Sequence, residues 1–545
     1  MSNLSQIRRD GMLLFLEKLR NEHKDDESLI AINEIENALT NKKYGLVWEE
    51  HEEDENLIIR RNFPVFTEHK EKEIKGNKNN DNYNFLLEGD NLHSLKLLEK
   101  THKEKIDVIY IDPPYNTGNK DFRYYDSYVN GDDAFKHSMW LSFMYERLMI
   151  AKTLLKKDGY IFVSINDVES AQLKLILDEI LGENNFVAQL VWESTTQPTN
   201  AGSAKFNIQK KTEPIYVYSK NWNYKRPFLL AKQENELKYP HDGRFGKCRF
   251  EIIEKSDAGA YSRQSMKFKI LGQEPREGKR WQIGEETAKE LEAKGRLEII
   301  DGIVKKAIYP EDEIDRVQYV PFWSLLASNE VGTAQVGKDE LNKILGYAAG
   351  FDTVKPVKLI KTLLSHFHNN IIVLDFFAGS GTTAQAVMEM NAEDCGNRRV
   401  ILCTDNQNNI CEEITYVRLL NLITGKNTNK EAMFENFKYF KTAFVPKSTD
   451  DEFYSVGEEL QKHIKEMVQL EKGISIENDN YILLLSDEEA DELENNPSRL
   501  DRCKRIYISS GVFLTDTQEK MLKSIPIETI PDYFFESELR EVGEL

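Results

Sequence analysis

Four consecutive residues at the end of an apolar run carry most of the chemistry in this chain. Asp112, Pro113, Pro114 and Tyr115 follow the apolar segment 106–111. The prolines fix the backbone φ angle and have no N–H group, so neighbouring carbonyl oxygens are left as hydrogen-bond acceptors. Asp112 adds a carboxylate, and the Tyr115 ring offers a face for stacking. Together these residue types predict a site for a planar amine, with a plain Pro-Pro turn as the alternative.

A second segment predicts a ligand-binding turn. The apolar run 371–374 leads through Asp375 into residues 377–381, Phe-Ala-Gly-Ser-Gly, and then into a helical pattern. The glycines at 379 and 381 allow a ligand to approach the backbone closely, and the following helix N-terminus favours a negative group such as a carboxylate. The turn lacks the third glycine of a dinucleotide loop and the Gly-Lys-Ser/Thr of a phosphate loop. We therefore expect a different cofactor here.

The two motifs together resemble those of the DNA amino-methyltransferases that use S-adenosylmethionine. Residues 112–115 resemble the catalytic loop of that family, and residues 377–381 resemble its cofactor loop. The catalytic loop comes first in the chain, which resembles the permuted β class. The extended string at 112–118 and the chain length resemble the modification subunits of Type III restriction–modification systems. The resemblance covers roughly residues 45–445.

The resemblance implies an α/β fold, with a doubly wound, circularly permuted, Rossmann-like methyltransferase sheet, an inserted target-recognition domain and helical or α+β terminal extensions. Strand ends at 90, 112 and 379–381 are expected to meet at one edge of the sheet. Asp405, at the next strand end, would take the ribose hydroxyls, and Glu412 competes for that role. The residues so assigned to catalysis are Asp112, Pro113, Pro114 and Tyr115, and those assigned to S-adenosylmethionine are Asp90, Asp112, Lys355, Asp375, Phe377, Ala378, Gly379, Ser380, Gly381, Thr382 and Asp405.

The charge of the chain is unevenly distributed. The net charge of −20 argues against nucleic-acid binding, yet residues 203–281 contain 18 Lys and Arg against 9 Asp and Glu, which gives +9. This basic stretch predicts a surface for double-stranded DNA, whereas charge runs elsewhere are read as solvated faces. The residues predicted to bind DNA are Lys205, Lys210, Lys211, Arg226, Arg244, Lys247, Arg249, Arg263, Lys267 and Lys269.

The chain is long enough for several domains. We expect an N-terminal helical segment at 1–44 and a catalytic half at 45–220, whose first part, 45–81, is a loop or arm. A target-recognition domain is expected at 221–335 and a cofactor-binding half at 336–446. Residues 447–545 are expected to form an acidic interaction domain for a protein partner.

The resemblance implies transfer of a methyl group to the N6 amine of an adenine rotated out of the duplex, because the family's adenine enzymes mostly carry Asp at the position of Asp112. We expect a homodimer that works with a separate nuclease–helicase subunit. The alternatives are a solitary methyltransferase, an enzyme acting on cytosine N4, RNA or a protein glutamine, and a non-enzymatic DNA-binding subunit. Intact residues at all four positions 112–115 disfavour the last.

The five cysteines match no disulfide framework and no zinc spacing, so no metal is expected. The sequence has no apolar run as long as a membrane span, and its N-terminal residues lack the apolar core of a signal peptide. We therefore expect a soluble, intracellular protein, and the family resemblance implies the bacterial cytoplasm.

Overall fold

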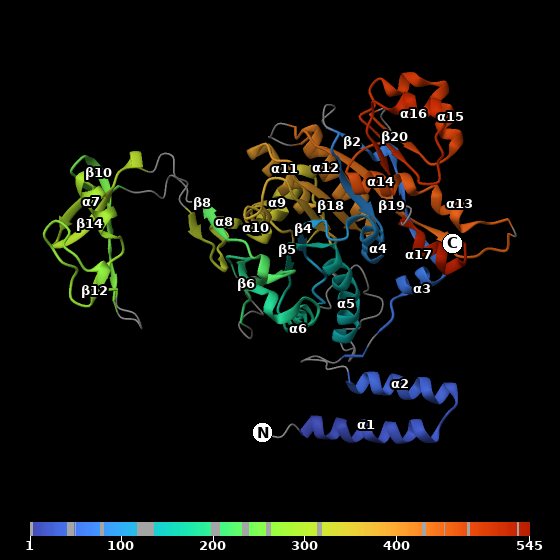
Figure 1. Ribbon diagram of the computed structural model, residues 1–545, viewed down its shortest axis with the longest axis horizontal. Helices are drawn as coiled ribbons and strands as arrows, with labels where there is room; N and C mark the ends of the chain where they lie inside the picture. The colour runs from blue at the N-terminus through green and yellow to red at the C-terminus, as the bar shows by residue number, and fades with distance from the viewer. Residues whose placement is uncertain are drawn as a thin grey trace. The chain divides into compact units, whose positions relative to one another are not determined.

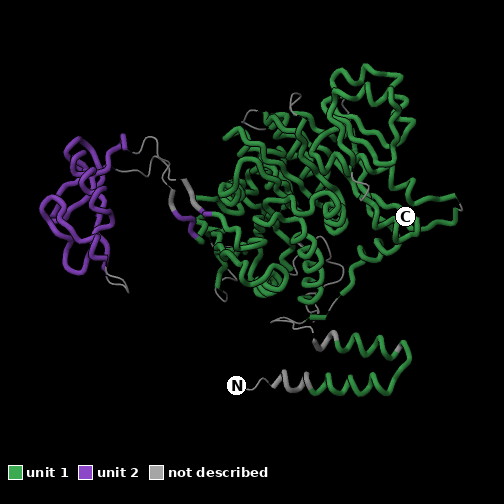
Figure 2. Tube along the Cα trace, viewed as in Figure 1, with its two compact units in different colours: residues 1–226, 324–545 green, residues 227–323 purple. Residues whose placement is uncertain are grey.

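The computed structural model describes residues 4–40, 48–49, 51–76, 81–116, 136–197, 208–231, 239–257, 263–312, 319–351, 353–427, 432–451, 453–476, 480–530 and 534–544. The chain divides into two compact units, one of residues 1–226 and 324–545 and the other of residues 227–323 (Figure 2). The second unit thus interrupts the first in sequence.

Within the described residues, eleven strands of the first unit form one sheet in the order β1-β19-β3-β18-β17-β4-β5-β7-β6-β16, with β2 paired to β19 (Figure 1). The strands β3, β18, β17, β4 and β5 are parallel, and β7 is antiparallel to both of its neighbours. The bounds are β1 Asn62–Glu68, β2 Ile74–Lys75, β3 Asn84–Glu88, β4 Ile106–Ile111, β5 Leu155–Ser164, β6 Phe186–Glu193, β7 Thr212–Ser219, β16 Leu325–Leu326, β17 Ile372–Asp375, β18 Arg399–Thr404 and β19 Asn436–Pro446.

The helices cover both faces of this sheet. α11 (Thr382–Asp394) connects β17 to β18, and α12 (Tyr416–Thr424) leads from β18 to β19, so these crossovers move along the sheet toward β19. α4 (Asn91–His102) connects β3 to β4, and α5 (Lys136–Leu154) connects β4 to β5, so these crossovers move along the sheet in the opposite direction. Because parallel crossovers are right-handed, the two pairs lie on opposite faces. α9 (Ala334–Leu345) packs on α12, α10 (Val357–Leu364) on α11, and α6 (Ser170–Leu177) on α5. The expected doubly wound α/β fold is confirmed.

The strand order places a crevice at the centre of the sheet. β17 and β4 are neighbours, yet the chain leaves β17 toward β18 on one side and leaves β4 toward β5 on the other. Ligands of open α/β sheets bind outside the carboxyl ends of the strands at such a switch point. The turn at 377–381 follows β17 and residues 112–115 follow β4, so the fold brings both predicted loops to this position.

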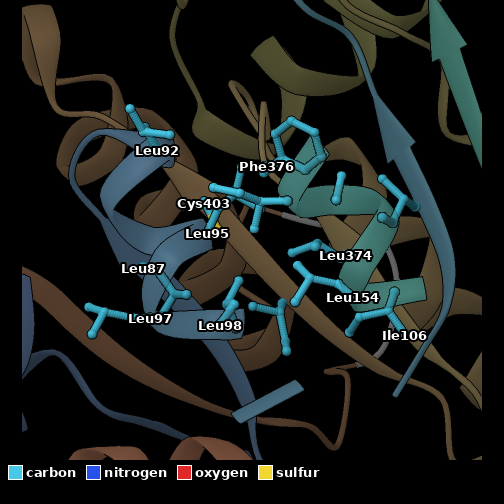
Figure 3. Close-up of a cluster of buried hydrophobic side chains, with 14 of the residues drawn as sticks. Leu87, Leu92, Leu95, Leu97, Leu98, Ile106, Leu154, Leu374, Phe376 and Cys403 are labelled. Carbon is cyan, nitrogen blue, oxygen red and sulfur yellow. The ribbon is translucent and has the colours of Figure 1, made fainter. Parts of the chain in front are cut away.

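The core under this crevice fixes α4 on the sheet (Figure 3). Leu92, Leu95 and Leu98 recur at helical spacing on α4 and are fully buried. They join the cluster that Figure 3 labels, which includes Leu87, Leu97, Ile106, Leu154, Leu374, Phe376 and Cys403. Each buried leucine contributes roughly 1.5–3 kcal/mol. The start of α4, next to the crevice, is therefore held firmly.

The N-terminal helices form as expected, as α1 (Leu4–Glu22) and α2 (Asp26–Thr40), which pack on each other. The expectation of a loop or arm at 45–81 is wrong for much of that range. α3 (Asp54–Arg61) leads into β1, which pairs antiparallel with β19 from Asn62 opposite Pro446 to Glu68 opposite Phe440. Phe63, Val65 and Phe66 of this strand are buried, and its partner comes from almost 400 residues later in the chain.

Residues 447–545 share the core of the first unit in part. Side chains of α13 (Val456–Gln461) and α14 (Ile464–Lys472), including Met467, belong to the core cluster that contains the central strands. Farther on, a parallel sheet with the order β20-β21-β22 and two helices enclose a small core of their own: β20 Tyr481–Leu484, β21 Arg505–Ile508, β22 Ile527–Thr529, α15 Asp487–Asn495 and α16 Asp516–Leu522; α17 (Glu536–Val542) follows. The boundary predicted at residue 446 thus does not coincide with a break between the two compact units.

The second unit has an antiparallel sheet with the order β13-β14-β10-β9 and its own core around Trp281, Leu297 and Val304. Its elements are β8 Leu229–Ala231, β9 His241–Gly243, β10 Gly246–Ile252, β11 Glu254–Ser256, β12 Lys279–Trp281, α7 Glu285–Ala293, β13 Leu297–Ile300, β14 Ile303–Ile308 and β15 Tyr319–Pro321. The unit lies within the range 221–335 that the sequence sets apart. Among the helices of the described ranges, none is long and apolar enough to cross a membrane.

Candidate active site

One cavity of about 210 Å³ contains both predicted loops. It lies at the carboxyl ends of β4 and β17, at the switch point of the sheet. Its lining residues are Tyr110, Asp112, Pro113, Pro114, Tyr115, Asn116, Phe351, Thr353, Val354, Lys355, Asp375, Phe377, Ala378, Gly379, Ser380, Thr382 and Thr383. Segments that are far apart in the sequence are therefore brought together around one space.

A hydrogen-bonded cluster forms one wall of the cavity. Lys355 Nζ lies 2.9 and 2.8 Å from the two carboxylate oxygens of Asp112 and 2.6 Å from Tyr115 Oη. The fourth member, Glu213 of β7, accepts a hydrogen bond of 3.0 Å from Tyr115 Oη and lies 3.5 Å from Lys355 Nζ. Lys355 is 6% exposed and Asp112 is 31% exposed, so the carboxylate is the member that reaches solvent.

Electrostatics set the protonation states of Lys355 and Tyr115 in this cluster. Burial disfavours the ammonium of Lys355, but the charges of Asp112 and Glu213 outweigh burial and raise the pKa of Lys355. Burial, followed by the same two carboxylates, raises the pKa of Tyr115 well above its ordinary value. Tyr115 is therefore a neutral hydroxyl donor and Lys355 a permanent cation near neutral pH.

Side chains from other elements fix the loop at 112–115. Trp140 Nε1 on α5 donates to the carbonyl of Pro114 at 2.8 Å. Asn116 has a left-handed φ of 56°, and its amide donates to the fully buried carboxylate of Glu169. Burial raises the pKa of Glu169. The carboxyl-terminal end of the loop is thus held by groups outside it.

The glycine loop, residues 377–381, is held by the side chains of Thr415 and Asp375. Gly381 has a φ of 78°, and a Cβ placed there would lie 3.1 Å from Thr415 Cγ2. Thr415 Oγ1 donates to the Gly379 carbonyl at 2.5 Å. Asp375, at the end of β17, accepts from Phe377 N at 3.1 Å and from Thr383 Oγ1 at 2.5 Å. Burial, although opposed by these two hydrogen bonds, raises the pKa of Asp375 to about 7.

Arg418 of α12 lies fully buried behind the glycine loop. Its Nη1 donates to the Ser380 carbonyl at 3.1 Å and to Thr382 Oγ1 at 3.0 Å, and its Nε donates to Gln385 at 2.9 Å. Burial lowers the pKa of Arg418 to about 10. This guanidinium, which is not among the described lining residues of the cavity, therefore fixes the loop through buried hydrogen bonds.

The segment that carries Lys355 depends on a close approach to α9. A Cβ at Gly337 would lie 2.2 Å from the carbonyl oxygen of Val354 and 2.8 Å from the carbonyl carbon of Lys355. Glycine at position 337 is therefore needed for the backbone of residues 354–355 to lie against the helix. This contact sets the distance between Lys355 and the loop at 112–115.

Three of the residues predicted for the cofactor do not line this cavity in the described part of the chain: Asp90, Gly381 and Asp405. Asp90 accepts a hydrogen bond from Leu92 N at 2.7 Å at the start of α4 and pairs with the buried Arg147 at 3.3 Å. Asp405 directly follows β18 and is almost fully buried. Its competitor Glu412 forms an ion pair with Lys72. This pairing favours Asp405 for the ribose, which stays a prediction.

The residues predicted to bind DNA are divided between the two units. Lys205 lies outside the described residues. In the first unit Lys210, Lys211 and Arg226 form ion pairs with Asp167, Glu193 and Asp158. In the second unit Lys247, Arg249 and Lys267 pair with Asp242, Glu251 and Asp257, whereas the exposed Arg244, Arg263 and Lys269 complete the set. None of these positions tests the assignment to DNA.

Four residues of the site were missed at the level of sequence: Glu213, Trp140, Glu169 and Arg418. Each lies outside the two loops in sequence and reaches them only through the folded chain. Glu213 carried a weak signal, because it is an acidic residue directly before the apolar strand residues 214–218. The other three had no signal beyond their residue type.

Comparison with known proteins identifies the family to which this chain is similar. The family described as DNA methylase (N6_N4_Mtase) matches residues 106–470. The Type III restriction-modification enzyme StyLTI Mod subunit of Salmonella typhimurium is 32% identical over 425 residues, which cover 69% of this chain and 63% of that protein. The Type II methyltransferase M.KpnI of Klebsiella pneumoniae is 31% identical over 388 residues, which cover 66% of this chain and 90% of that protein.

The EcoPI Mod subunit of Escherichia phage P1 is 32% identical, and the match covers 59% of this chain and 58% of that protein. The chain thus spans 58% to 63% of the length of these two Type III Mod subunits. Among solved structures, the cytosine-N4-specific PvuII DNA methyltransferase matches with a TM-score of 0.34 and 13% identity, over 72% of this chain and 95% of that one. The family match contains both loops of the cavity and more than half of the residues, so the chain belongs to the N6/N4 DNA methylase family.

Proposed function

We propose that this chain is a site-specific DNA methyltransferase that transfers a methyl group from S-adenosylmethionine to the N6 amine of adenine. The observation that carries the proposal is the single cavity shared by the loop at 112–115 and the glycine loop. One loop has the acceptors and the ring that an amine on a flat heterocycle needs. The other has an open backbone at the start of a helix. Methyl transfer needs both within one space.

The residues around the glycine loop fit the proposed cofactor. Gly379 lines the cavity, and a Cβ there would meet only the Phe377 carbonyl oxygen within 4 Å, so the backbone is open to a ligand. The N-terminus of α11 would favour the cofactor's carboxylate. Asp112 provides a carboxylate on the cavity wall, and Asp405 would take the ribose. When bound, S-adenosylmethionine supplies an electrophilic methyl group on a positively charged sulfur.

The loop at 112–115 would hold and orient the target amine. Its lone pair is delocalised into the base, and hydrogen bonds accepted by Asp112 and by the Pro113 carbonyl would turn the nitrogen toward a tetrahedral geometry. Trp140 already occupies the carbonyl of Pro114. The Tyr115 ring would stack on a base rotated out of the duplex, because a paired amine is inaccessible. Asp112 supports adenine over cytosine by family resemblance.

The second unit would recognise the target sequence. It is a compact insertion of 227–323 between the two loops and contains most of the basic stretch 203–281. Its exposed cations would contact phosphates and fix the register on DNA, while other side chains read base edges. This would be the target-recognition domain within residues 221–335.

We further propose that the chain is the modification subunit of a Type III system in the bacterial cytoplasm, that it forms a homodimer and that it pairs with a nuclease–helicase subunit. The similarity to Type III Mod subunits supports this interpretation. The similarity to M.KpnI, a Type II methyltransferase, keeps a solitary enzyme as the second candidate. Recovery of a nuclease–helicase subunit with the tagged chain would support the Type III role, and its failure to associate would favour the solitary enzyme.

The direct test offers labelled S-adenosylmethionine and several acceptors to the purified full chain. Mixed-sequence duplex DNA, RNA and a glutamine-containing protein are compared, and the products are identified by mass spectrometry. We expect label in DNA alone, as N6-methyldeoxyadenosine. Label in N4-methylcytosine, in RNA or in the protein, or no transfer at all, would overturn the proposal.

A further inference from the structure

The hydrogen-bonded cluster of Asp112, Tyr115, Glu213 and Lys355 contains two carboxylates that compete for the one hydroxyl proton of Tyr115. Tyr115 Oη lies 2.8 Å from Asp112 Oδ1 and 3.0 Å from Glu213 Oε2. A phenolic hydroxyl has one proton, so Tyr115 donates to one of these carboxylates at a time. The near-equal distances give the hydroxyl two well-formed arrangements.

Lys355 is shared in the same way. Its Nζ lies within 2.9 Å of both oxygens of Asp112 and 3.5 Å from Glu213 Oε2. The ring of Trp192 lies 5.4 Å from Nζ, and Trp192 is directly opposite Glu213 in the pairing of β6 with β7. The ammonium is thus enclosed between two carboxylates and an aromatic face, and it can be held by either carboxylate.

These two donors already occupy Asp112, and all three residues line the cavity. Asp112 Oδ1 receives both Lys355 Nζ and Tyr115 Oη. Asp112 lines the cavity, whereas Glu213 does not belong to the described lining residues and is 17% exposed. An amine that approaches Asp112 has to compete with the donors already bound to Oδ1. Glu213 is placed to receive a displaced donor without touching the amine.

We propose that Glu213 is a positioning residue that takes over the Tyr115 hydroxyl, and part of the Lys355 charge, when Asp112 accepts the target amine. This inference rests on the proposed function and adds a residue to it. The transfer leaves one oxygen of Asp112 open toward the cavity. It also keeps Tyr115 anchored through its hydroxyl, so that the ring stays in place as a stacking surface.

Removing the charge of Glu213 should therefore slow the chemical step. In Glu213→Gln the ammonium and the hydroxyl both concentrate on Asp112, which becomes a poorer acceptor. The single-turnover methylation rate is expected to fall roughly tenfold or more, while the Kd values for S-adenosylmethionine and DNA change less than about threefold. Glu213→Asp keeps the charge and is expected to recover part of the rate.

The pH dependence gives a readout that a purely structural role would not move. The titratable groups that surround Lys355 Nζ are Asp112 and Tyr115 after β4 and Glu213 on β7, with Tyr110 and Asp375 beyond Asp112. Both carboxylates support the raised pKa of Lys355. Loss of one carboxylate should lower the pKa of Lys355. The alkaline limb, which is the fall of the single-turnover rate at high pH as Lys355 loses its proton, should then move to lower pH.

Asp178→Asn is the matched control. Asp178 accepts a hydrogen bond of 2.7 Å from the hydroxyl of Tyr218 on the same strand β7 and one of 2.5 Å from Lys174. It thus pairs with a tyrosine and a lysine as Glu213 does, but away from the cavity. Its rate and its alkaline limb are expected to match those of the wild type.

The experiment compares single-turnover rates of wild type, Glu213→Gln, Glu213→Asp, Asp178→Asn, Tyr115→Phe and the double variant Tyr115→Phe/Glu213→Gln across pH. We expect the Glu213→Gln variant to have a lower single-turnover rate and an alkaline limb at lower pH than the wild type. We also expect Glu213→Gln to lower the rate less in the Tyr115→Phe background, where the hydroxyl is absent. A wild-type rate for Glu213→Gln overturns the inference. So does an alkaline limb at the wild-type pH combined with the same loss of rate from Glu213→Gln in the wild-type and Tyr115→Phe backgrounds. A wild type that transfers no methyl group refutes the proposed function instead, and the inference falls with it.

Discussion

Lys355 and Asp112 form an ion pair of 2.8 Å although 243 positions separate them in the chain. The pair joins the segment before α10 to the loop after β4, on either side of the inserted second unit. Because Lys355 is almost fully buried, breaking the pair by removing one partner would leave an uncompensated charge. The contact therefore couples the two halves of the permuted sheet at the point where chemistry is proposed.

Replacing Gly381 by valine should weaken cofactor binding. The φ of 78° is unfavourable for valine, and the new Cβ would press on Thr415, which also holds the Gly379 carbonyl. Calorimetry is expected to show at least roughly a tenfold rise in the Kd for S-adenosylmethionine. Gly543→Val is the control, because Gly543 has a φ of 76° but no heavy atom within 4 Å. Equal Kd values for the two variants would contradict the assignment of the loop.

Arg418→Met should loosen the glycine loop from behind. It removes hydrogen bonds to Ser380, Thr382 and Gln385 and leaves these buried groups without their donor. We expect a loss of about 3 kcal/mol in the free energy of unfolding and weaker cofactor binding. Arg540→Met, which removes only an exposed pair with Glu536, should cost less than about 1 kcal/mol. Chemical denaturation measures both, and a wild-type stability of Arg418→Met would be inconsistent with the clamp.

Asp375 should make stability depend on pH. Burial raises its pKa to about 7 from an ordinary value of 3.8, so the native state keeps a proton that the unfolded chain releases. The stabilising contribution is complete below the ordinary value and is lost as pH rises through about 7. Asp375→Asn removes this titration, so its melting temperature relative to wild type should rise between these pH values. Parallel curves for the two proteins would show that Asp375 is not perturbed.

DNA binding should fall steeply with salt if the second unit contacts phosphates. Each lost phosphate contact reduces the slope of log K against log salt by about 0.9. Replacing the exposed Arg244, Arg263 and Lys269 by serine should therefore flatten the slope by up to about 2.7. Fluorescence anisotropy over a range of salt concentrations measures this. An unchanged slope would mean that other residues contact the backbone of DNA.

The central sheet and both loops follow from the sequence because their signals are local. Apolar runs followed by Asp112 or by the glycine loop identify strand ends, and parallel strand ends meet at one edge. β1 could not be predicted, since its pairing with β19 depends on a partner almost 400 residues away. Segment 62–68 contains the apolar residues Phe63, Val65 and Phe66, but it is short and lies within a charged stretch.

The support around the loops could not be predicted for the same reason. Trp140 and Arg418 act through hydrogen bonds to backbone carbonyls of other segments, and a carbonyl offers no sequence signal. Glu213 lies on β7, where its contact with Tyr115 depends on the position of β7 next to β5. The residues of the two loops could be predicted from the sequence, whereas the residues that position these loops are identified only in the folded structure.

Methylome sequencing of DNA from cells that express this chain alone, compared with cells that express Asp112→Asn, shows directly whether the chain methylates adenine and whether Asp112 is needed. The substitution keeps the shape of the side chain but removes the charge that accepts the amine and pairs with Lys355. We expect N6-methyladenine within a single recognition sequence for the wild type and none for the variant, although the purified variant still binds S-adenosylmethionine. Unmodified DNA from the wild type, methylation on cytosine, or equal methylation by Asp112→Asn would contradict this expectation.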